Sequence, residues 1–194
     1  NIQHGLVREA LRLTGIESGV EITTIADIPG QGTGLGSSSS VTVGLLNAMH
    51  AFQGREASKE QLAEEACMIE IETLGAPIGR QDQYAASFGG VNSIRFGENG
   101  VQVEPIEVSE ELSQKFSENF TLVFTGLTRS ATKVLSEESD DESDKNSRMR
   151  EIRKHADEAA SHIEHGDLDS LGAILNQTWI SKRGVSSMVT NTQI

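Results

Sequence analysis

The stretch Ile28–Ser40, with the sequence Ile-Pro-Gly-Gln-Gly-Thr-Gly-Leu-Gly-Ser-Ser-Ser-Ser, is the basis of the fold prediction. A run rich in β-branched residues, Val20–Ala26, precedes it, and an apolar run with helical spacing, Val41–Phe52, follows it. We therefore expect a strand, a glycine-rich loop and the start of a helix. Glycines let backbone N–H groups approach a ligand closely, and the first N–H groups of a helix have no partner within it. Such a loop can bind a phosphate group without a nearby lysine, because the helix dipole also favours an anion there.

Two common phosphate-binding loops do not fit this stretch. The Walker pattern ends in Gly-Lys-Ser/Thr, but the first lysine of the chain is Lys59. The dinucleotide-binding fingerprint needs glycines separated by one residue and then by two, whereas successive glycines of the set Gly30, Gly32, Gly34 and Gly36 are all separated by one. A plain connector whose serines cap the helix is the remaining alternative, but plain connectors are seldom placed tightly between a strand and a strong helix.

The composition describes an acidic chain of 194 residues with enough apolar residues for a core. The length provides for one domain, or one and a half. The net charge of −13 argues against nucleic acid and anionic membranes as partners, since both need basic patches. No stretch approaches the roughly 18 apolar residues of a membrane span, no signal peptide is visible, and the single cysteine, Cys67, forbids an internal disulfide. We expect a cytoplasmic protein, and the start within a helical pattern without a methionine indicates a fragment of a longer chain.

Two acidic residues stand out downstream of the loop. Glu70 interrupts the apolar stripe of the helix predicted over 58–74, and a carboxylate on a buried face needs a cation, a metal ion or a proton. Spacing alone does not distinguish this from a residue at the helix boundary. Asp82 lies in the turn-rich loop 75–84, where an aspartate is usually a turn or cap residue. His50, alone near a helix end, is expected to be structural.

These motifs resemble those of the GHMP kinases, a family named for galactokinase, homoserine kinase, mevalonate kinase and phosphomevalonate kinase. Pro29-x-x-x-x-Gly-Leu-Gly-Ser-Ser-Ser39 is similar to the phosphate-binding motif of the family. Gly79-x-x-Asp-Gln-Tyr84, with a Gly-Gly pair soon after, is similar to the loop that carries the catalytic aspartate. In the sugar kinases of the family, a glutamate twelve residues before that aspartate helps to bind magnesium, and counting back from Asp82 reaches Glu70.

The resemblance implies a role for each residue of these motifs. Ser38 and Glu70 would hold Mg²⁺, and Asp82 would orient or deprotonate the acceptor hydroxyl. Contacts to the acceptor are expected from Gln83, Gly126 and Arg129, since the Thr125-Gly-x-x-Arg-Ser-Ala segment is similar to one in the sugar kinases and a guanidinium binds phosphate bidentately. The residues expected to bind ATP are Gly32, Gly34, Leu35, Gly36, Ser37, Ser38 and Ser39.

The function implied is ATP-dependent phosphorylation of a hydroxyl of a sugar or sugar phosphate, with heptose 7-phosphate at its anomeric position as the best candidate. Two alternatives stay open: a kinase of this family for fucose, galactose or mevalonate, and a remnant that binds a nucleotide or sugar without turnover. The run Ser130-Ala-Thr-Lys133 matches the Ser-x-x-Lys of serine acyl-enzymes, but short matches are common and the companion motifs of those enzymes are missing. We expect ATP and the acceptor as partners, no nucleic acid and no membrane, with a homodimer as one possible assembly.

The fold class expected is α+β. The resemblance implies a ribosomal protein S5 domain 2-like N-terminal domain over residues 1–117 and a ferredoxin-like C-terminal domain over residues 118–194. Both are expected to be incomplete, because the opening and closing motifs of the family are missing. The acidic run 137–144 predicts a solvated connection. The sequence patterns predict helices over 2–13, 37–52, 58–74, 109–117, 145–165 and 168–184, and strands over 20–26, 91–96, 101–106 and 120–124.

Overall fold

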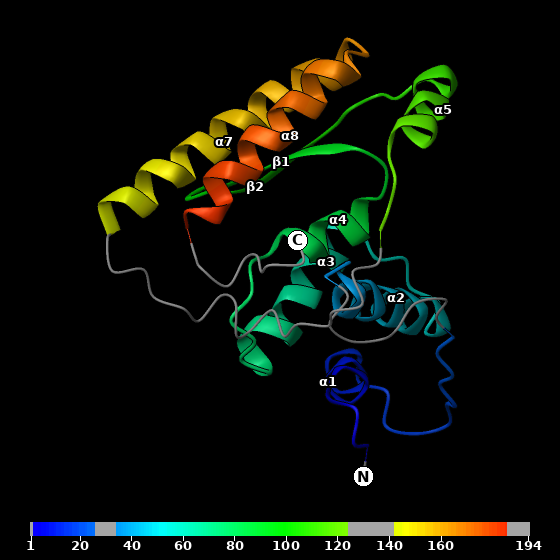
Figure 1. Cartoon of the computed structure of the whole chain (residues 1–194). Coiled ribbons are helices and arrows are strands. Elements are labelled where there is room, and N and C mark those ends of the chain that lie inside the picture. Colours follow the sequence, from blue (N-terminus) through cyan, green and yellow to red (C-terminus); the bar gives the residue numbers. More distant parts are fainter. Residues whose placement is uncertain (1, 26–33, 124–141, 186–194) are drawn as a thin grey trace. The chain divides into compact units, whose positions relative to one another are not determined.

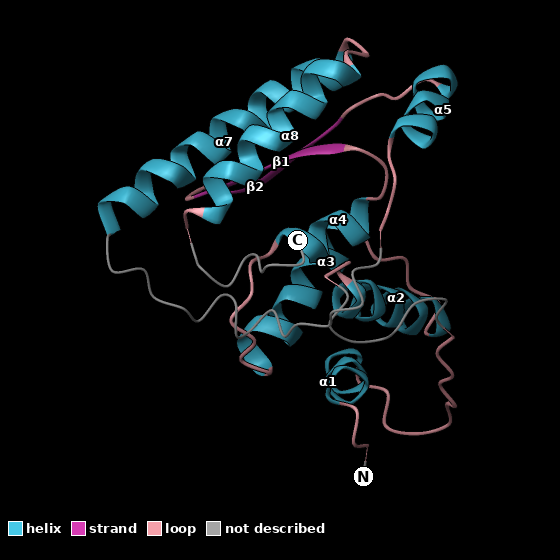
Figure 2. Ribbon diagram, viewed as in Figure 1, coloured by secondary structure: helices cyan, strands magenta, loops and turns pink. Residues whose placement is uncertain are grey.

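The computed structural model describes residues 2–25, 34–123 and 142–185, which form two compact units (Figures 1 and 2). Unit 1 contains the described residues up to Gly89, and unit 2 contains those from Gly90 onward. Unit 1 is built of helices and their connections, whereas unit 2 combines a β-hairpin with helices. The chain therefore mixes helix and sheet. The boundary between residues 89 and 90 separates two groups of residues that pack among themselves. The domain boundary between residues 117 and 118, which the family resemblance implies, stays a prediction.

The helices of unit 1 are α1 (Gly5–Thr14), α2 (Ser37–Phe52), α3 (Lys59–Cys67), the π-helix η1 (Met68–Thr73) and α4 (Gln81–Phe88). Helix α2 has the bounds that its apolar spacing predicts, and it contacts α1, α3 and α4. It is therefore the central helix of the unit. The buried apolar cluster consists of Ala10, Leu11, Ile16, Val43, Leu45, Leu46, Met49, Leu62, Ala66 and Ile69.

Local sequence signals explain where these helices begin and end. Gly15 ends α1 with a left-handed φ of 74°, which a residue with a β-carbon adopts only at a cost. The Ser58 side chain accepts a hydrogen bond from the N–H of Gln61 at the start of α3, as the capping-box pattern predicts. The helix predicted over 58–74 is not α-helical to its end, because Leu74 N–H donates to the carbonyl of Ile69 at 3.0 Å, five residues back.

Two predicted strands are not strands in the structure. Residues 20–25 and 120–123, the described parts of the predicted strands, carry no strand assignment. A strand exists only where its backbone groups pair with a neighbour, and the part of the chain that the structure describes contains a single two-stranded sheet. Apolar and β-branched residues alone therefore gave an incorrect prediction at both places.

Unit 2 begins with a hairpin in which β1 (Asn92–Gly97) pairs antiparallel with β2 (Gly100–Pro105). Gly97 pairs with Gly100, so the connection has two residues, and the φ of 109° at Gly100 suits glycine. The hairpin predicted from the Gly-Glu-Asn-Gly turn is thus confirmed. Helix α5 (Glu110–Asn119) follows, and its cap Ser109 accepts a hydrogen bond from the N–H of Leu112 at 3.1 Å.

The rest of unit 2 is a helical hairpin of α7 (Glu142–Glu164) and α8 (Leu168–Arg183), which pack against each other. Helix α7 begins at Glu142 rather than at Lys145, so the end of the predicted acidic connection is helical. The pair Arg148–Asp144, at 2.8 Å, supports this first turn, because residues four apart face each other on a helix. The remainder of the acidic run lies outside the described residues. Along the described helices, no segment combines the length and the apolar character needed to cross a bilayer.

Candidate active site

The glycine-rich loop enters α2 through two glycines with left-handed backbone. Gly34 has φ +72° and Gly36, the N-cap of α2, has φ +66°. A side chain at either position would strain the backbone, which explains the glycines. The N-cap residue is Gly36, which has no side chain and so provides no side-chain cap. The first turn of α2 has the positive end of the helix dipole, which suits an anion.

Two serine hydroxyls of this turn point to Glu70 on the π-helix η1. The Ser38 hydroxyl donates to Glu70 Oε2 at 2.9 Å, and the Ser39 hydroxyl lies 3.5 Å from the same atom. The Glu70 side chain is 3% exposed, and its other oxygen, Oε1, is buried without a hydrogen-bond partner. Within the described residues, no basic side chain forms an ion pair with Glu70. A buried carboxylate in this state suits a bound cation.

Asp82, in the first turn of α4, lies beside the same loop. A β-carbon built on Gly36 would lie 3.4 Å from Asp82 Cγ and 3.7 Å from its Oδ2. The structure therefore brings Glu70 and Asp82 to the same Gly34–Ser38 turn. Three segments far apart in the sequence meet there: the glycine-rich loop, the end of the predicted helix 58–74, and the loop 75–84.

Of the other residues predicted for the site, three belong to the described part of the chain and three do not. Leu35 is 48% exposed at the loop, and Ser37 begins α2. Gln83 is completely buried, so its side chain is enclosed in this structure rather than presented to an acceptor. Gly32, Gly126 and Arg129 lie outside the described residues, so their roles stay predictions.

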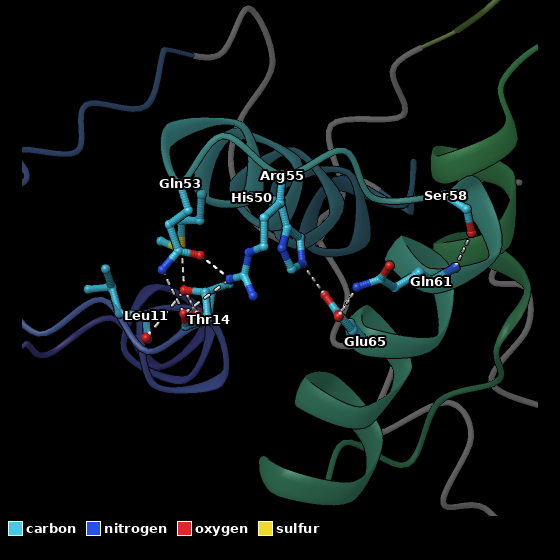
Figure 3. Close-up of polar contacts among 10 residues, drawn as sticks. Leu11, Thr14, His50, Gln53, Arg55, Ser58, Gln61 and Glu65 are labelled. Atoms are coloured by element: carbon cyan, nitrogen blue, oxygen red, sulfur yellow. Dashed lines mark hydrogen bonds and ion pairs between the residues drawn. The ribbon is translucent and has the colours of Figure 1, made fainter.

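A polar network holds α2 against its neighbours (Figure 3). His50 Nε2 lies 2.7 Å from Glu65 Oε2, and Gln61 donates to Glu65 Oε1 at 2.7 Å, which ties α2 to α3. Gln53 donates to the Thr14 carbonyl at 2.9 Å, which ties α2 to the end of α1. His50 is 4% exposed and hydrogen-bonded, so the prediction of a structural histidine is confirmed. The network fixes the helix that begins at the glycine-rich loop against the helix that continues to Glu70.

Sequence analysis missed a second link, which joins α3 to the start of α4. The Arg80 guanidinium donates to the Tyr84 hydroxyl at 3.4 Å and lies 5.5 Å from the centre of the Tyr84 ring. A hydrogen bond with Cys67 raises the pKa of Arg80, whereas burial raises the pKa of the Cys67 thiol despite that contact. Cys67 and Arg80 stand shortly before Glu70 and Asp82, so this contact joins the segments that carry the two carboxylates. No periodicity in the sequence marks such a pair.

A mostly apolar hollow lies elsewhere on unit 1. It has a volume of about 490 Å³ and is lined mostly by apolar atoms of residues 20–25 and of the side of α2 that carries Val41, Leu45 and Phe52. None of the loop or carboxylate residues described above lines it. It is therefore not the place where the predicted polar chemistry would occur.

Residues 2–90 match the family model of the GHMP kinases N terminal domain. This match covers the N-terminal part of the chain, and residues 2–90 are similar to that domain of the GHMP kinases. A curated relative, the D-glycero-alpha-D-manno-heptose 7-phosphate kinase of Campylobacter jejuni, is 32% identical over 174 residues, which are 88% of this chain and 51% of the relative. A solved structure, of a D-glycero-D-manno-heptose 1-phosphate kinase from Bacteroides thetaiotaomicron, matches with a TM-score of 0.76 and 28% identity over 92% of this chain and 55% of that one. The chain spans about half the length of both proteins.

Proposed function

We propose that the protein to which this chain belongs is an ATP-dependent kinase that phosphorylates a hydroxyl of a sugar phosphate. The observation that carries the proposal is the meeting of a helix start, which the chain enters through two glycines, with two carboxylates, Glu70 and Asp82, at Gly36. Phosphoryl transfer needs the phosphates held, their charge neutralised and the acceptor hydroxyl oriented. The three groups that meet here supply one of these functions each.

In this proposal the phosphates of ATP lie on the turn from Gly34 to Ser39. Because Gly34 and Gly36 have no side chains, the backbone there can come close to the phosphates. The N–H groups in the first turn of α2 would face the phosphates. Gly32 and Leu35 would complete the loop. An acidic chain with net charge −13 thus binds a polyanion through backbone dipoles rather than through a basic patch.

The residues present also fit Mg²⁺, which prefers oxygen ligands. Glu70 Oε1 is a buried oxygen without a partner, and the Ser38 hydroxyl lies beside the same carboxylate. These two side chains would hold the ion next to the phosphates. When bound, Mg²⁺ neutralises charge on the transferred phosphoryl group and its leaving group.

Asp82 is proposed to act on the acceptor hydroxyl. Its side chain is exposed in the first turn of α4 and lies against the loop, so its carboxylate can accept the proton of the acceptor hydroxyl while holding that oxygen toward the phosphates. Arg129 and Gly126 are proposed for the acceptor side, with the Arg129 guanidinium for a phosphate that the acceptor already carries. Gln83 is completely buried and is not proposed as an acceptor contact.

The acceptor proposed is heptose 7-phosphate, phosphorylated at its anomeric hydroxyl. The names of the two relatives support a heptose phosphate but differ in the position of the phosphate. The family architecture supports an S5 domain 2-like domain followed by a ferredoxin-like domain in the whole protein. A cytoplasmic location and a homodimer belong to the same proposal.

The test uses the full-length protein with Mg·ATP and a panel of acceptors: heptose 7-phosphate, heptose 1-phosphate, fucose, galactose and mevalonate. ADP release with a heptose phosphate is the expected result, and Asp82→Asn should abolish most of it while keeping Mg·ATP affinity. If another acceptor alone is consumed, the substrate class is wrong. If no acceptor supports ADP release, the protein is a non-catalytic nucleotide- or sugar-binding relative.

A further inference from the structure

Gln83, the residue after Asp82, is buried in an unusual state. Its side chain is 0% exposed, and neither its amide nitrogen nor its amide oxygen has a hydrogen-bond partner. Buried polar groups are almost always paired, because an unpaired one loses its hydration without compensation. A fully buried amide without hydrogen bonds therefore destabilises the ligand-free chain.

The position of this amide connects it to the candidate site. In the part of the chain covered by the structure, the buried side-chain atoms without partners belong to two residues, Glu70 and Gln83. Glu70 faces Ser38 at the glycine-rich loop, and Gln83 adjoins Asp82, which abuts Gly36. Both unsatisfied groups thus lie on segments that meet at one turn of α2.

Other buried polar groups near that turn are satisfied. The Thr42 hydroxyl, which is completely buried, donates to the Ser38 carbonyl at 2.9 Å. The Ser39 side chain is 1% exposed, and its hydroxyl lies 3.5 Å from Glu70 Oε2. Helix α4 packs against α2 and α3, so Gln83 is enclosed within this helical core. The missing hydrogen bonds of Gln83 are therefore a local exception and not a general property of the core.

We propose that Gln83 is a positioning residue. Its amide has no hydrogen bonds in the ligand-free chain and gains them when bound Mg·ATP brings the first turn of α2 and Glu70 closer to α4. The inference rests on the proposed function and specifies how a buried residue acts in it. Gln83 touches neither ATP nor the acceptor in this scheme. It makes binding of the ligand and closure of the helices around Asp82 mutually dependent.

This arrangement has a thermodynamic signature. An apolar side chain of similar size at position 83 removes the unsatisfied amide, so it should stabilise the ligand-free chain. The same change removes the hydrogen bonds that form on loading, so Mg·ATP should bind less tightly. An amide with a purely structural role would give a loss of stability and no separate loss of affinity.

The experiment compares the wild-type chain with Gln83→Met, and with Gln83→Leu as a second apolar shape. The urea midpoint is measured without ligand, and the Mg·ATP dissociation constant is measured by calorimetry, with ATP in EDTA as the metal-free reference. We expect a higher midpoint without ligand and a loss of Mg·ATP affinity of about fivefold, since one hydrogen bond of ordinary strength contributes about 1 kcal/mol. Gln81→Met, the same change at an exposed position of α4, should alter neither quantity.

Two results would overturn the inference. If both apolar variants are less stable than the wild type without ligand, the amide is satisfied in the free chain, for example by a buried water. If they bind Mg·ATP as tightly as the wild type, Gln83 is not coupled to the ligand. A wild-type chain that does not bind Mg·ATP would reject the proposed site together with the ligand-linked role, and the ligand-free midpoints would then still show whether the amide is unsatisfied.

Discussion

Replacing Gly36 by alanine tests whether Asp82 lies beside the glycine-rich loop in solution. The change adds one methyl group and removes no chemical group from the site. Its β-carbon would lie 3.4 Å from Asp82 Cγ, which is ordinary contact, and would fill the gap between the loop and the carboxylate. Gly34→Ala is the matched control, because its φ of +72° is similar and no atom of the described residues lies within 4 Å of its β-carbon.

The expected loss of stability is the same for both variants. A left-handed backbone costs a residue with a β-carbon about 1–2 kcal/mol, and alanine recovers about 0.4–1 kcal/mol by restricting the unfolded chain. The net loss is therefore about 1 kcal/mol. For a chain of this size that corresponds to a melting temperature lower by about 2–4 °C. Because the contact with Asp82 is not a clash, Gly36→Ala should lose no more than Gly34→Ala.

The two variants should differ in turnover. A methyl group against the Asp82 carboxylate takes the space that the acceptor hydroxyl needs, and a displacement of about 1 Å in a reacting pair costs up to roughly 100-fold in rate. We expect kcat of the full-length Gly36→Ala protein to fall roughly 10- to 100-fold. In Gly34→Ala the effect should fall on KM for ATP.

Thermal unfolding of this chain and ADP release by the full-length protein measure the two quantities. Equal kcat values for the two alanine variants would refute the placement of Asp82 beside Gly36. A much larger loss of stability in Gly36→Ala would show that the β-carbon meets a clash that the structure does not contain.

Three further predictions concern contacts away from the Gly34–Ser38 turn. In a double-mutant cycle with His50→Gln and Glu65→Gln, urea unfolding should give a coupling energy of about 1.5–3 kcal/mol, because the hydrogen bond is short and buried and joins an imidazole to a carboxyl group. A coupling near zero would contradict the role of this pair in holding α2 to α3. Burial raises the pKa of the Cys67 thiol, so iodoacetamide should alkylate this thiol slowly at neutral pH and faster only as the pH rises above the ordinary thiol range. Rapid labelling of the folded chain at pH 7, detected by mass spectrometry, would contradict this. Arg95→Ala should lower the free energy of unfolding, measured in urea, by at most about 1 kcal/mol, because the ion pair of Arg95 with Asp157 is 2.9 Å long but about half exposed. A loss above about 2 kcal/mol would show that the pair is buried in solution.

The helices were the most predictable part of the fold. Apolar spacing gave α2 its correct bounds, and serine and glycine caps marked the start of α3 and the end of α1. The signals succeeded because a helix satisfies its backbone within itself and its cap is local. Residues 20–25 and 120–123 failed for the opposite reason, since a strand depends on a partner that its own residues do not specify.

For the candidate site, the sequence identified the side chains that meet but not how they meet. Helical spacing marked Glu70 as a carboxylate on a buried face, and its burial confirms that feature. The resemblance to the GHMP kinases supplied the link to Asp82. The contact of Arg80 with Cys67, the bond from Ser38 to Glu70 and the unsatisfied amide of Gln83 depend on packing between separate helices, which no local pattern encodes.

The π-helix η1 has a consequence for how the spacing between the two carboxylates can change. A π-turn holds one residue more than an α-turn, so a chain can lose a residue there and return to regular α-helix without unravelling. Here the wide turn closes from Leu74 to Ile69, and Glu70 lies inside it with its own carbonyl bonded to the N–H of Ala76. A single-residue deletion in this turn would rotate everything that follows by about a quarter of a circle relative to what precedes it. The number of residues between Glu70 and Asp82 therefore determines how the two carboxylates are oriented relative to each other. Insertions or deletions between them should be rarer than substitutions.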